Sequence, residues 1–489
     1  MSKNLMIQGT MSGAGKSILT AGILRVLRQD GYRVAPFKSQ NMALNSFVTR
    51  DGKEIGRAQA VQARAAQIEP SSDMNPILLK PMGDTTSQVI VNGVPIGNMR
   101  AADYFRMKKQ LIPDIISAYD RLSKETDIIV IEGAGSPVEI NLRENDIVNM
   151  GLAQMLDAPV LLAGNIDPGG VFAQLLGTVN LMSDEERKRV KGLIINKFRG
   201  DVSLLKPGLS MFYEYCKIPF AGIVPYVNLD LEEEDSISER LENKIARGSE
   251  EEIIRIAVVR LPYISNYSDF SILQRIPGVS LIYTKRADDI KNADMIIIPG
   301  TKNTLKDMNW LRESGLADEI IKASYGKALV VGICGGLQML GEKIDDKDFL
   351  EGGGNCNGLG LLPITTTFNH EKMLRQTKGI IAGLTDDYVS LNGLDISGYE
   401  IHMGTSDMDE KKLPIMNKEN VFGTYIHGIF DSAKACRKLL EIICEKKGLK
   451  DVTFDIEDEA SHQEKELDRL ADVLRDSLDF DLIYEAIGI

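Results

Sequence analysis

Short β-branched runs alternate with longer amphipathic stretches over the first 225 residues of the chain. Each run is apolar throughout and is followed by a turn and a stretch with helical spacing. Strands of a parallel sheet look like this because helices cover both of its faces. The pattern therefore predicts a parallel α/β domain. Its expected strands are Leu5–Gln8, Val34–Phe37, Ile128–Ile131, Val160–Ala163 and Leu193–Asn196.

A second series of the same kind follows a charged stretch. We expect a first α/β domain at 1–230, a linker at 231–252, a second α/β domain at 253–445 and a helical extension at 446–489, where leucines recur at helical spacing. The predicted fold is thus α/β, with two doubly wound, mostly parallel sheets and a helical C-terminal segment. The second set of expected strands is Ile256–Leu261, Ser280–Tyr283, Met295–Pro299 and Ala328–Ile333.

Composition excludes several classes of protein. The 489 residues are 43% hydrophobic, which is enough to build a sizeable core. Lys and Arg number 57 and Asp and Glu 70, so the net charge of −13 argues against non-specific nucleic-acid binding. Five cysteines without a CxxC pair fit a reducing compartment. Because no signal peptide and no apolar run of about 18 residues is found, we expect a cytoplasmic protein with no membrane partner.

A glycine-rich loop, GTMSGAGKS, joins the first predicted strand to the first helix. The backbone N–H groups of such a loop wrap phosphates, Lys16 would add a mobile cation, and the Ser17 hydroxyl suits Mg²⁺. We therefore predict a phosphate site at Gly13, Gly15, Lys16 and Ser17. The first glycine lies six residues before Gly15 rather than the usual five, so the loop is a variant of the motif. A glycine-rich turn without a ligand is the alternative.

Other strand ends also carry polar residues. Glu132 follows an apolar strand, where a Mg²⁺ ligand or a water-orienting group belongs, although a helix N-cap would also explain it. The turn that begins at Asn165 could line the phosphate site or serve only as a turn. Asn196 and Lys197 begin like a base-reading NKxD element, but its fourth position is Arg199. The motif therefore predicts no choice of nucleobase.

A cysteine follows a strand of the second domain in the sequence GICGG. The glycines around Cys334 permit the sharp turn of a nucleophile elbow, which exposes the sulfur and favours the thiolate. A thiol nucleophile needs a base, and His427 in YIHGIF is the candidate. Strand alternation places Glu400 and His402 on one face, where either could orient His427 or hold substrate. A buried structural cysteine and a cross-strand structural pair are the alternatives.

This combination of domains resembles the glutamine amidotransferases that make corrinoids, and most closely the cobyric acid synthases. The resemblance covers nearly the whole chain. The matching segments are PFKSQNMALNS from Pro36, EIGRAQAVQARAA from Glu54, NPILLKPMGDTTSQVIVNG from Asn75, IEGAGSPVEINL from Ile131, PGTKNT from Pro299 and GYEIHMG from Gly398. Most class I amidotransferases carry Glu two residues after the catalytic His, whereas this chain has Ile429. The cobyric acid synthases are similar in lacking that acid, which leaves the third triad role open, with Glu400 as the candidate.

The resemblance implies a reaction in two halves. Cys334 would attack the side-chain amide of glutamine while His427 moves the proton, and backbone N–H groups near Gly300 and after Cys334 would hold the oxyanion. The ammonia released would then meet a carboxylate that ATP and Mg²⁺ have activated at the glycine loop. Phosphorylation is needed because a carboxylate alone is too poor an electrophile.

The same resemblance implies the acceptor, adenosylcobyrinic acid a,c-diamide. Four of its peripheral carboxylates (b, d, e and g) would become amides to give adenosylcobyric acid for cobalamin. Asp146 is a further candidate for positioning this substrate. Glutamine, ATP and the corrinoid are the expected partners, and no oligomeric state is predicted. Residues of the matching segments that could bind the acceptor are Lys38, Gln40, Asn41, Arg57, Lys80 and Gln88.

Two alternatives compete with this prediction. Cobyrinic acid a,c-diamide synthase uses the same mechanism on two other carboxylates, but the segments SQNMALNS and EIGRAQ argue against it. A P-loop switch of the ParA kind would need no nucleophile. The glycine-flanked Cys334 and its partner His427 argue against such a switch.

Overall fold

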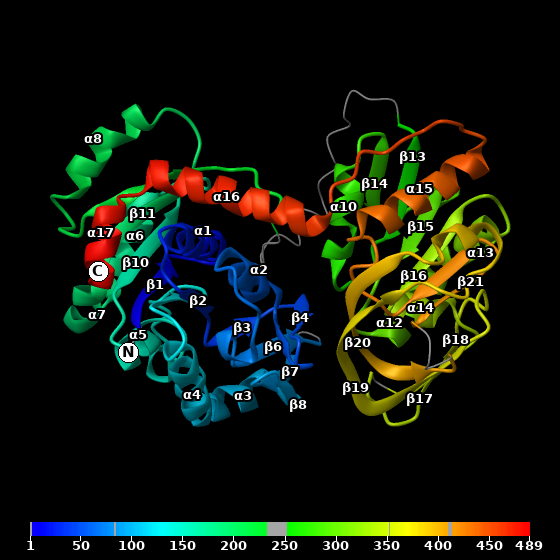
Figure 1. Ribbon diagram of the computed structural model, residues 1–489. Coiled ribbons are helices and arrows are strands. Elements are labelled where there is room, and N and C mark those ends of the chain that lie inside the picture. Colours follow the sequence, from blue (N-terminus) through cyan, green and yellow to red (C-terminus); the bar gives the residue numbers. More distant parts are fainter. Residues whose placement is uncertain (1, 83–84, 232–251, 352, 409–412) are drawn as a thin grey trace. The chain divides into compact units, whose positions relative to one another are not determined.

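The computed structural model describes residues 2–82, 85–231, 252–351, 353–408 and 413–489. These residues form two compact units, shown in Figure 1. Among the described residues, the first unit holds 2–49, 53–231 and 463–489, and the second holds 50–52 and 252–462. Most of the predicted linker, residues 232–251, lies outside the described residues.

A six-stranded parallel sheet forms the centre of the first unit. The strand order reverses beside β1, because β9 and β10 lie on either side of it. Ligands of open α/β sheets bind at such a switch point, beyond the carboxyl ends of the strands. The predicted parallel fold is confirmed. In spatial order the strands are β12 (Phe220–Pro225), β11 (Val190–Phe198), β10 (Val160–Asn165), β1 (Lys3–Gly9), β9 (Ile128–Glu132) and β2 (Val34–Phe37).

Successive side chains of β1 enter two different cores, one on each face of this sheet. Leu5 and Ile7 pack with α1 (Lys16–Gln29), whereas Met6 packs with the residues of α4 (Ile112–Ser123) and α6 (Val171–Leu181). This alternation explains why the three successive residues Leu5, Met6 and Ile7 are all apolar. The remaining helices here are α3 (Ala101–Met107), α5 (Met150–Met155), α7 (Asp184–Arg189) and α8 (Val202–Phe212).

A second, four-stranded sheet of the first unit was not predicted. Its strands are short or only partly apolar, so they lack the signal of a buried parallel strand. A two-stranded ribbon precedes α2 (Arg57–Ala65). The strands of the sheet are, in spatial order, β3 (Gln40–Met42), β6 (Ile77–Pro81), β7 (Thr86–Val91) and β8 (Val94–Arg100), and those of the ribbon are β4 (Ser46–Val48) and β5 (Glu54–Gly56).

From Gln463 onwards, the C-terminal helices α16 (Glu459–Ser477) and α17 (Phe480–Ile487) complete the first unit. Leu470 and Leu474 of α16 share a core with α1. Arg25 of α1 is 3% exposed and donates hydrogen bonds to Glu464 at 2.7 Å and Asp468 at 2.8 Å. The sequence predicted helices here but did not indicate which domain they would cover.

The second unit also contains a six-stranded sheet, parallel except for the β21–β22 pair, and the predicted strands are again present. The second unit also contains a mixed four-stranded sheet, in which β20 pairs antiparallel with β19. The main sheet is β14 (Val279–Thr284), β13 (Ile254–Val259), β15 (Met295–Ile298), β16 (Leu329–Ile333), β22 (Val421–Thr424) and β21 (Ile415–Lys418). The mixed sheet is β18 (Gly354–Asn357), β17 (Lys343–Asp346), β19 (Thr365–Ile380) and β20 (Asp395–Ser406). The helices are α10 (Ser271–Arg275), α11 (Ala287–Lys291), α12 (Thr304–Glu313), α13 (Leu316–Ser324), α14 (Gly335–Leu340) and α15 (Ala433–Lys447).

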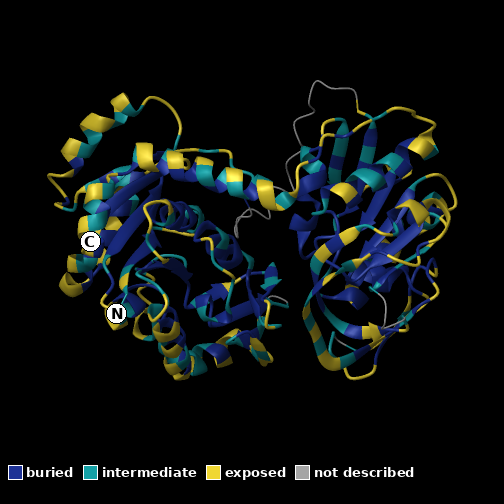
Figure 2. Cartoon of the chain, in the orientation of Figure 1, coloured by how far each residue is buried: buried dark blue, intermediate teal, exposed yellow. Residues whose placement is uncertain are grey.

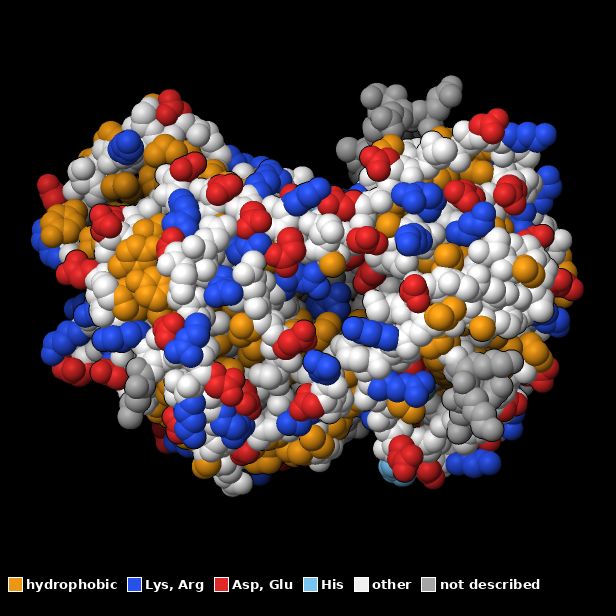
Figure 3. Space-filling view, in the orientation of Figure 1, with side chains coloured by type: hydrophobic (Ala, Val, Ile, Leu, Met, Phe, Trp, Pro, Cys, Tyr) orange, Lys and Arg blue, Asp and Glu red, His pale blue; other side chains and the backbone are white. Residues whose placement is uncertain are grey.

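Burial follows this arrangement. Figure 2 shows buried residues concentrated in the central strands of both main sheets and exposed residues on the outer faces of the helices. In Figure 3 charges of both signs are interspersed, and hydrophobic side chains gather around α8, where Leu204 and Met211 are exposed. Among the described helices, none is both long and apolar enough to cross a membrane.

We predict that replacing Gly22 of α1 with alanine weakens the packing of α16 against α1. A Cβ at Gly22 would lie 2.4 Å from Leu474 Cδ1, so Gly22→Ala should destabilise the first unit by about 1–3 kcal/mol. The matched control is Gly177→Ala in α6, where a Cβ meets no atom within 4 Å and alanine should stabilise by about 0.5–1 kcal/mol. Denaturant unfolding followed by circular dichroism measures both changes. Equal stabilisation by the two substitutions would contradict the packing argument.

Candidate active site

The glycine loop between β1 and α1 is fixed by two asparagines at neighbouring strand ends. Asn196 Nδ2 donates to the Ala14 carbonyl at 2.9 Å, and Asn165 Nδ2 donates to the Gly13 carbonyl at 3.3 Å. Gly15 has φ +83°, and a Cβ there would lie 2.2 Å from Asn196 Nδ2. Glycine is therefore required at this position, both for the backbone conformation and for the close approach of Asn196.

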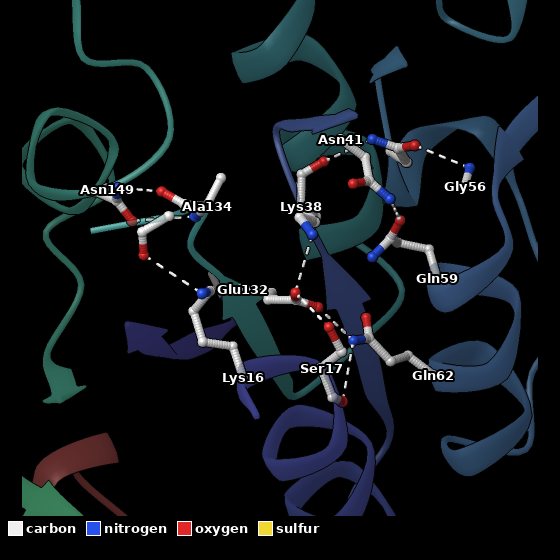
Figure 4. Close-up of polar contacts among 12 residues, drawn as sticks. Lys16, Ser17, Lys38, Asn41, Gly56, Gln59, Gln62, Glu132, Ala134 and Asn149 are labelled. Carbon is white, nitrogen blue, oxygen red and sulfur yellow. Dashed lines mark hydrogen bonds and ion pairs between the residues drawn. The ribbon is translucent and has the colours of Figure 1, made fainter. Parts of the chain in front are cut away.

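Glu132, at the end of β9, lies at the centre of a buried polar network (Figure 4). Its Oε1 accepts from Ser17 Oγ at 2.8 Å and from Lys38 Nζ at 3.0 Å, and its Oε2 accepts from Gln62 Nε2 at 2.5 Å. Burial alone would raise the pKa of Glu132, but the charge of Lys38 and the three hydrogen bonds outweigh it and lower that pKa. The carboxylate therefore stays charged inside the protein.

The Lys16 ammonium is held close to the same loop. Its Nζ donates to the Met11 carbonyl at 3.2 Å and to the Gly135 carbonyl at 3.3 Å. The segment after β9 is fixed in turn by Asn149, which donates to the Ala134 carbonyl at 2.6 Å and accepts from the Ala134 N–H at 3.1 Å. Lys16 is thus positioned between the glycine loop and the loop that follows Glu132.

These groups surround a cavity of about 280 Å³. It combines the glycine-rich loop and Lys16 at the start of a helix with the side chains of Lys38 and Lys197. Such an environment is suited to phosphate. The Ser17 hydroxyl and the Glu132 carboxylate are the hard oxygen donors that Mg²⁺ prefers, so both residues fit a metal held together with phosphate oxygens. The lining residues are Ser12, Gly13, Gly15, Lys16, Ser17, Ile18, Lys38, Asn41, Met42, Glu132, Ala134, Gly135 and Lys197.

The predicted acceptor-binding residues do not all lie at this cavity. Lys38 and Asn41 line it. Gln40 lies on the adjoining strand β3, where its Oε1 accepts from Tyr104 Oη at 2.6 Å. Lys38, Gln40 and Asn41 therefore remain candidates for contact with the acceptor.

Lys80 and Asp146 have structural contacts instead. Lys80 is 1% exposed and forms an ion pair with Glu54. Asp146 accepts hydrogen bonds at 2.9 Å from three backbone N–H groups, those of residues 148, 149 and 151 at the start of α5. Each side chain thus holds the fold locally, and a substrate role for either stays a prediction.

In the second unit, Cys334 occupies a strained turn between β16 and α14. Its φ is +55° and its ψ −109°, outside the regions that a cysteine usually adopts. A Cβ at Gly336 would lie 1.9 Å from the Ile298 carbonyl oxygen, and one at Gly335 would lie 2.6 Å from Thr301 Cγ2. The flanking glycines are therefore what allows the chain to present Cys334 in an elbow.

His427 is buried beside this turn. Its Nδ1 lies 2.7 Å from Asp269 Oδ2, and because a carboxylate only accepts, Nδ1 carries the proton. Burial alone would lower the pKa of His427, but Asp269 and the nearby Cys334 raise it to about 9. Its Nε2 has no hydrogen-bond partner among the described residues. The imidazole is thus oriented at one nitrogen and available at the other.

Asp269, rather than Glu400, is the carboxylate that contacts His427. Glu400 accepts from Arg375 Nε at 2.7 Å and from Thr377 Oγ1 at 2.5 Å. The prediction of Glu400 as the orienting acid is therefore wrong in this geometry. Sequence reasoning missed Asp269 because it lies in the short 3-10 helix Tyr267–Phe270, 158 residues before His427, and matches no spacing motif.

The loop after β15 approaches the same histidine. A Cβ at Gly300 would lie 3.2 Å from His427 Cε1, so glycine keeps this approach open. The Gly300 carbonyl accepts from Ser265 N–H at 2.9 Å. Asp307 of α12 accepts from the Thr301 hydroxyl, and burial raises the pKa of Asp307 to about 6. The loop predicted to supply an oxyanion donor is thus fixed beside the base.

Both parts of the chain match known families. Residues 5–237 match the CobQ/CobB/MinD/ParA nucleotide binding domain, and residues 255–435 match the CobB/CobQ-like glutamine amidotransferase domain. A cobyric acid synthase of Lachnoclostridium phytofermentans is 52% identical over 99% of both chains. The chain belongs to the cobyric acid synthase family.

Other members of the cobyric acid synthase family agree over the full length. The protein of Ruminiclostridium cellulolyticum is 50% identical and covers 100% of this chain and 97% of its own. That of Alkaliphilus metalliredigens is 46% identical over 99% of both chains. These matches confirm the family predicted from the sequence and the pairing of a nucleotide-binding domain with an amidotransferase domain.

We predict that Asp269→Asn impairs glutamine hydrolysis. With Asp269 the imidazolium of His427 persists up to its pKa of about 9 and is lost at higher pH. Without that negative charge the pKa falls, so the alkaline limb of the glutaminase pH profile should move to lower pH. We expect kcat to fall by about 10²–10⁴-fold, as for the loss of an orienting acid. Glu400→Gln is the matched control, and an equal loss and limb shift there would contradict the assignment.

Proposed function

We propose that the protein makes adenosylcobyric acid by amidating the b, d, e and g carboxylates of adenosylcobyrinic acid a,c-diamide, with ATP and glutamine. The observation that supports this proposal is that one chain of the cobyric acid synthase family pairs a buried cysteine and histidine with a cavity suited to phosphate. One unit holds Cys334 beside His427, and the other holds the phosphate-binding cavity with Lys16 and Glu132. The reaction would take place in the cytoplasm, where ATP and glutamine are available.

In the amidotransferase unit, Cys334 Sγ attacks the side-chain amide carbon of glutamine. His427 Nε2 gives its proton to the leaving ammonia, and the product on the enzyme is a glutamyl thioester. Water, deprotonated by the same imidazole, then cleaves the thioester to release glutamate and restore Cys334. Asp269 keeps the proton on Nδ1, so Nε2 faces the reacting atoms throughout.

In the synthetase unit, a corrinoid carboxylate attacks the γ-phosphorus of ATP and displaces ADP, giving an acyl phosphate. Ammonia then attacks the acyl carbon, and phosphate leaves as the amide forms. Lys16 and Lys38 line the cavity where negative charge gathers, so they offset it during transfer. Mg²⁺ held by Ser17 and Glu132 would neutralise further charge on the β- and γ-phosphates.

The direct test follows the corrinoid by mass spectrometry after incubation with ATP, Mg²⁺ and glutamine. Four successive replacements of OH by NH₂ are expected on adenosylcobyrinic acid a,c-diamide. Two replacements on cobyrinic acid, with none on the diamide, would instead assign the earlier amidation. No replacement on either acceptor, with ATP and glutamine hydrolysis intact, would refute a corrinoid substrate.

We predict opposite signatures for Cys334→Ala and Lys16→Ala. Without the thiol, glutamine no longer supports amidation, but added ammonia still does because the synthetase site is separate. Without Lys16, amidation fails with either nitrogen source while glutaminase activity remains. Rates of glutamate release and corrinoid amidation measure both. Comparable losses of ammonia-driven product in the two variants would contradict two separate sites.

We predict that Glu132→Gln raises the Mg²⁺ requirement of ammonia-driven amidation. The amide keeps the size of the side chain but removes the charge, so half-maximal activity should need about 10–100-fold more Mg²⁺. Titration of Mg²⁺ at saturating ATP measures the change. The control is Glu186→Gln, a buried carboxylate in the capping box of α7. An unaltered Mg²⁺ curve in Glu132→Gln would rule out the assigned metal contact.

A further inference from the structure

Two buried amides beside the cavity are not used by the chemistry described above. Asn41 is 1% exposed and Gln59 0% exposed. Asn41 Nδ2 donates to Gln59 Oε1 at 2.8 Å. Asn41 Oδ1 and Gln59 Nε2 have no hydrogen-bond partner among the described residues. Because a buried amide atom without a partner is costly, the pair points to a ligand that supplies the missing contacts.

The pair lies next to the site of group transfer. Asn41 lines the same cavity as Lys38. In Figure 4 the unpaired atoms of Asn41 and Gln59 both point to the side on which Lys38 lies. Gln59 is three residues before Gln62 on α2, so both project from one face of the helix, and Gln62 binds Glu132. One helix therefore holds both the amide pair and the network around Glu132.

The hydrogen bond between the amides fixes what they offer a ligand. Whichever way the two groups are turned, one bond between them leaves one whole NH₂ group and one carbonyl oxygen for the ligand. A primary carboxamide presents the complementary acceptor and donor. A carboxylate presents acceptors only, so one of its oxygens would face the carbonyl oxygen of the pair. The pair is thus matched to an amide rather than to an acid.

The surrounding backbone keeps the pair in place. A Cβ at Gly56 would lie 2.4 Å from Asn41 Nδ2 and 2.6 Å from Gln59 Oε1, so glycine is needed behind the two amides. Gly56 N–H donates to Asn75 Oδ1 at 3.0 Å, and Asn75 Nδ2 donates to the Lys38 carbonyl at 3.1 Å. Asn41 and Gln59 also belong to SQNMALNS and EIGRAQ, the segments that separated this chain from the diamide synthase.

We propose that Asn41 and Gln59 together bind a primary carboxamide that the acceptor already carries, and so select partly amidated corrinoids over fully carboxylated ones. The inference rests on the proposed function, since it concerns the acceptor of that reaction. Lys38 attracts the carboxylate to be activated, while the amide pair recognises a neighbouring amide on the same ring. The reaction that supplies the substrate must therefore itself be an amidation.

The test compares two acceptors in the ammonia-driven reaction: adenosylcobyrinic acid a,c-diamide and adenosylcobyrinic acid. In Gln59→Met and Gln59→Glu we expect kcat/KM for the diamide to fall about 10–100-fold, as for a buried polar group left unpaired. The value for the unamidated acid should change less than about threefold, within the spread of a lost neutral contact. Equilibrium binding of each corrinoid without ATP should show the same selectivity. Glutaminase rates and the KM for ATP should be unchanged.

Asn41→Asp provides a second variant, because it replaces the Nδ2 donor of the hydrogen bond to Gln59 with an acceptor. Its matched control is Asn4→Asp, at the start of β1, where the asparagine donates to Tyr119 Oη at 2.9 Å. Thermal unfolding verifies that each variant is folded. Equal losses for both acceptors, or none in the Gln59 variants, would overturn the amide assignment alone. A wild-type protein that binds and amidates neither corrinoid would overturn the proposed function and this inference together.

Discussion

Glu132 can remain charged in the interior of the first unit only because three side chains donate to it. Ser17 comes from the start of α1, Lys38 from the residue after β2, and Gln62 from α2. A buried carboxylate that lost these partners would carry a large desolvation penalty. This one group therefore couples the phosphate-binding loop, the neighbouring strand end and the helix that holds the amide pair.

The second unit also contains a buried charged group, but a single carboxylate compensates its charge. His427 is buried, and its charge is compensated by Asp269 from a short 3-10 helix far earlier in the chain. The Cys334 elbow depends on missing side chains rather than on added ones, since glycines at 335 and 336 leave room for the loop after β15. Charge compensation fixes the base, and close packing fixes the nucleophile, so the two catalytic groups are positioned by independent means.

Sequence reasoning succeeded where chemistry and local pattern coincide. The buried parallel strands, the glycine loop and the Cys334 elbow each carry a short-range signal, and the structure contains all of them. It failed where partners come from distant segments. A charged residue looks the same whether it faces a ligand or, like Lys80, a buried carboxylate. Asp269 had no motif to mark it, and the amide pair became visible only when two separate segments were placed side by side.

The placement of α16 and α17 has a consequence for synthesis of the chain. The apolar face of α1 belongs to the unit that begins the sequence, but the leucines that cover it are translated after the whole second unit. During translation this face of α1 therefore stays uncovered until α16 and α17 have left the ribosome. A fragment ending near residue 231 would keep its phosphate-binding loop but expose this surface, so it would be prone to self-association.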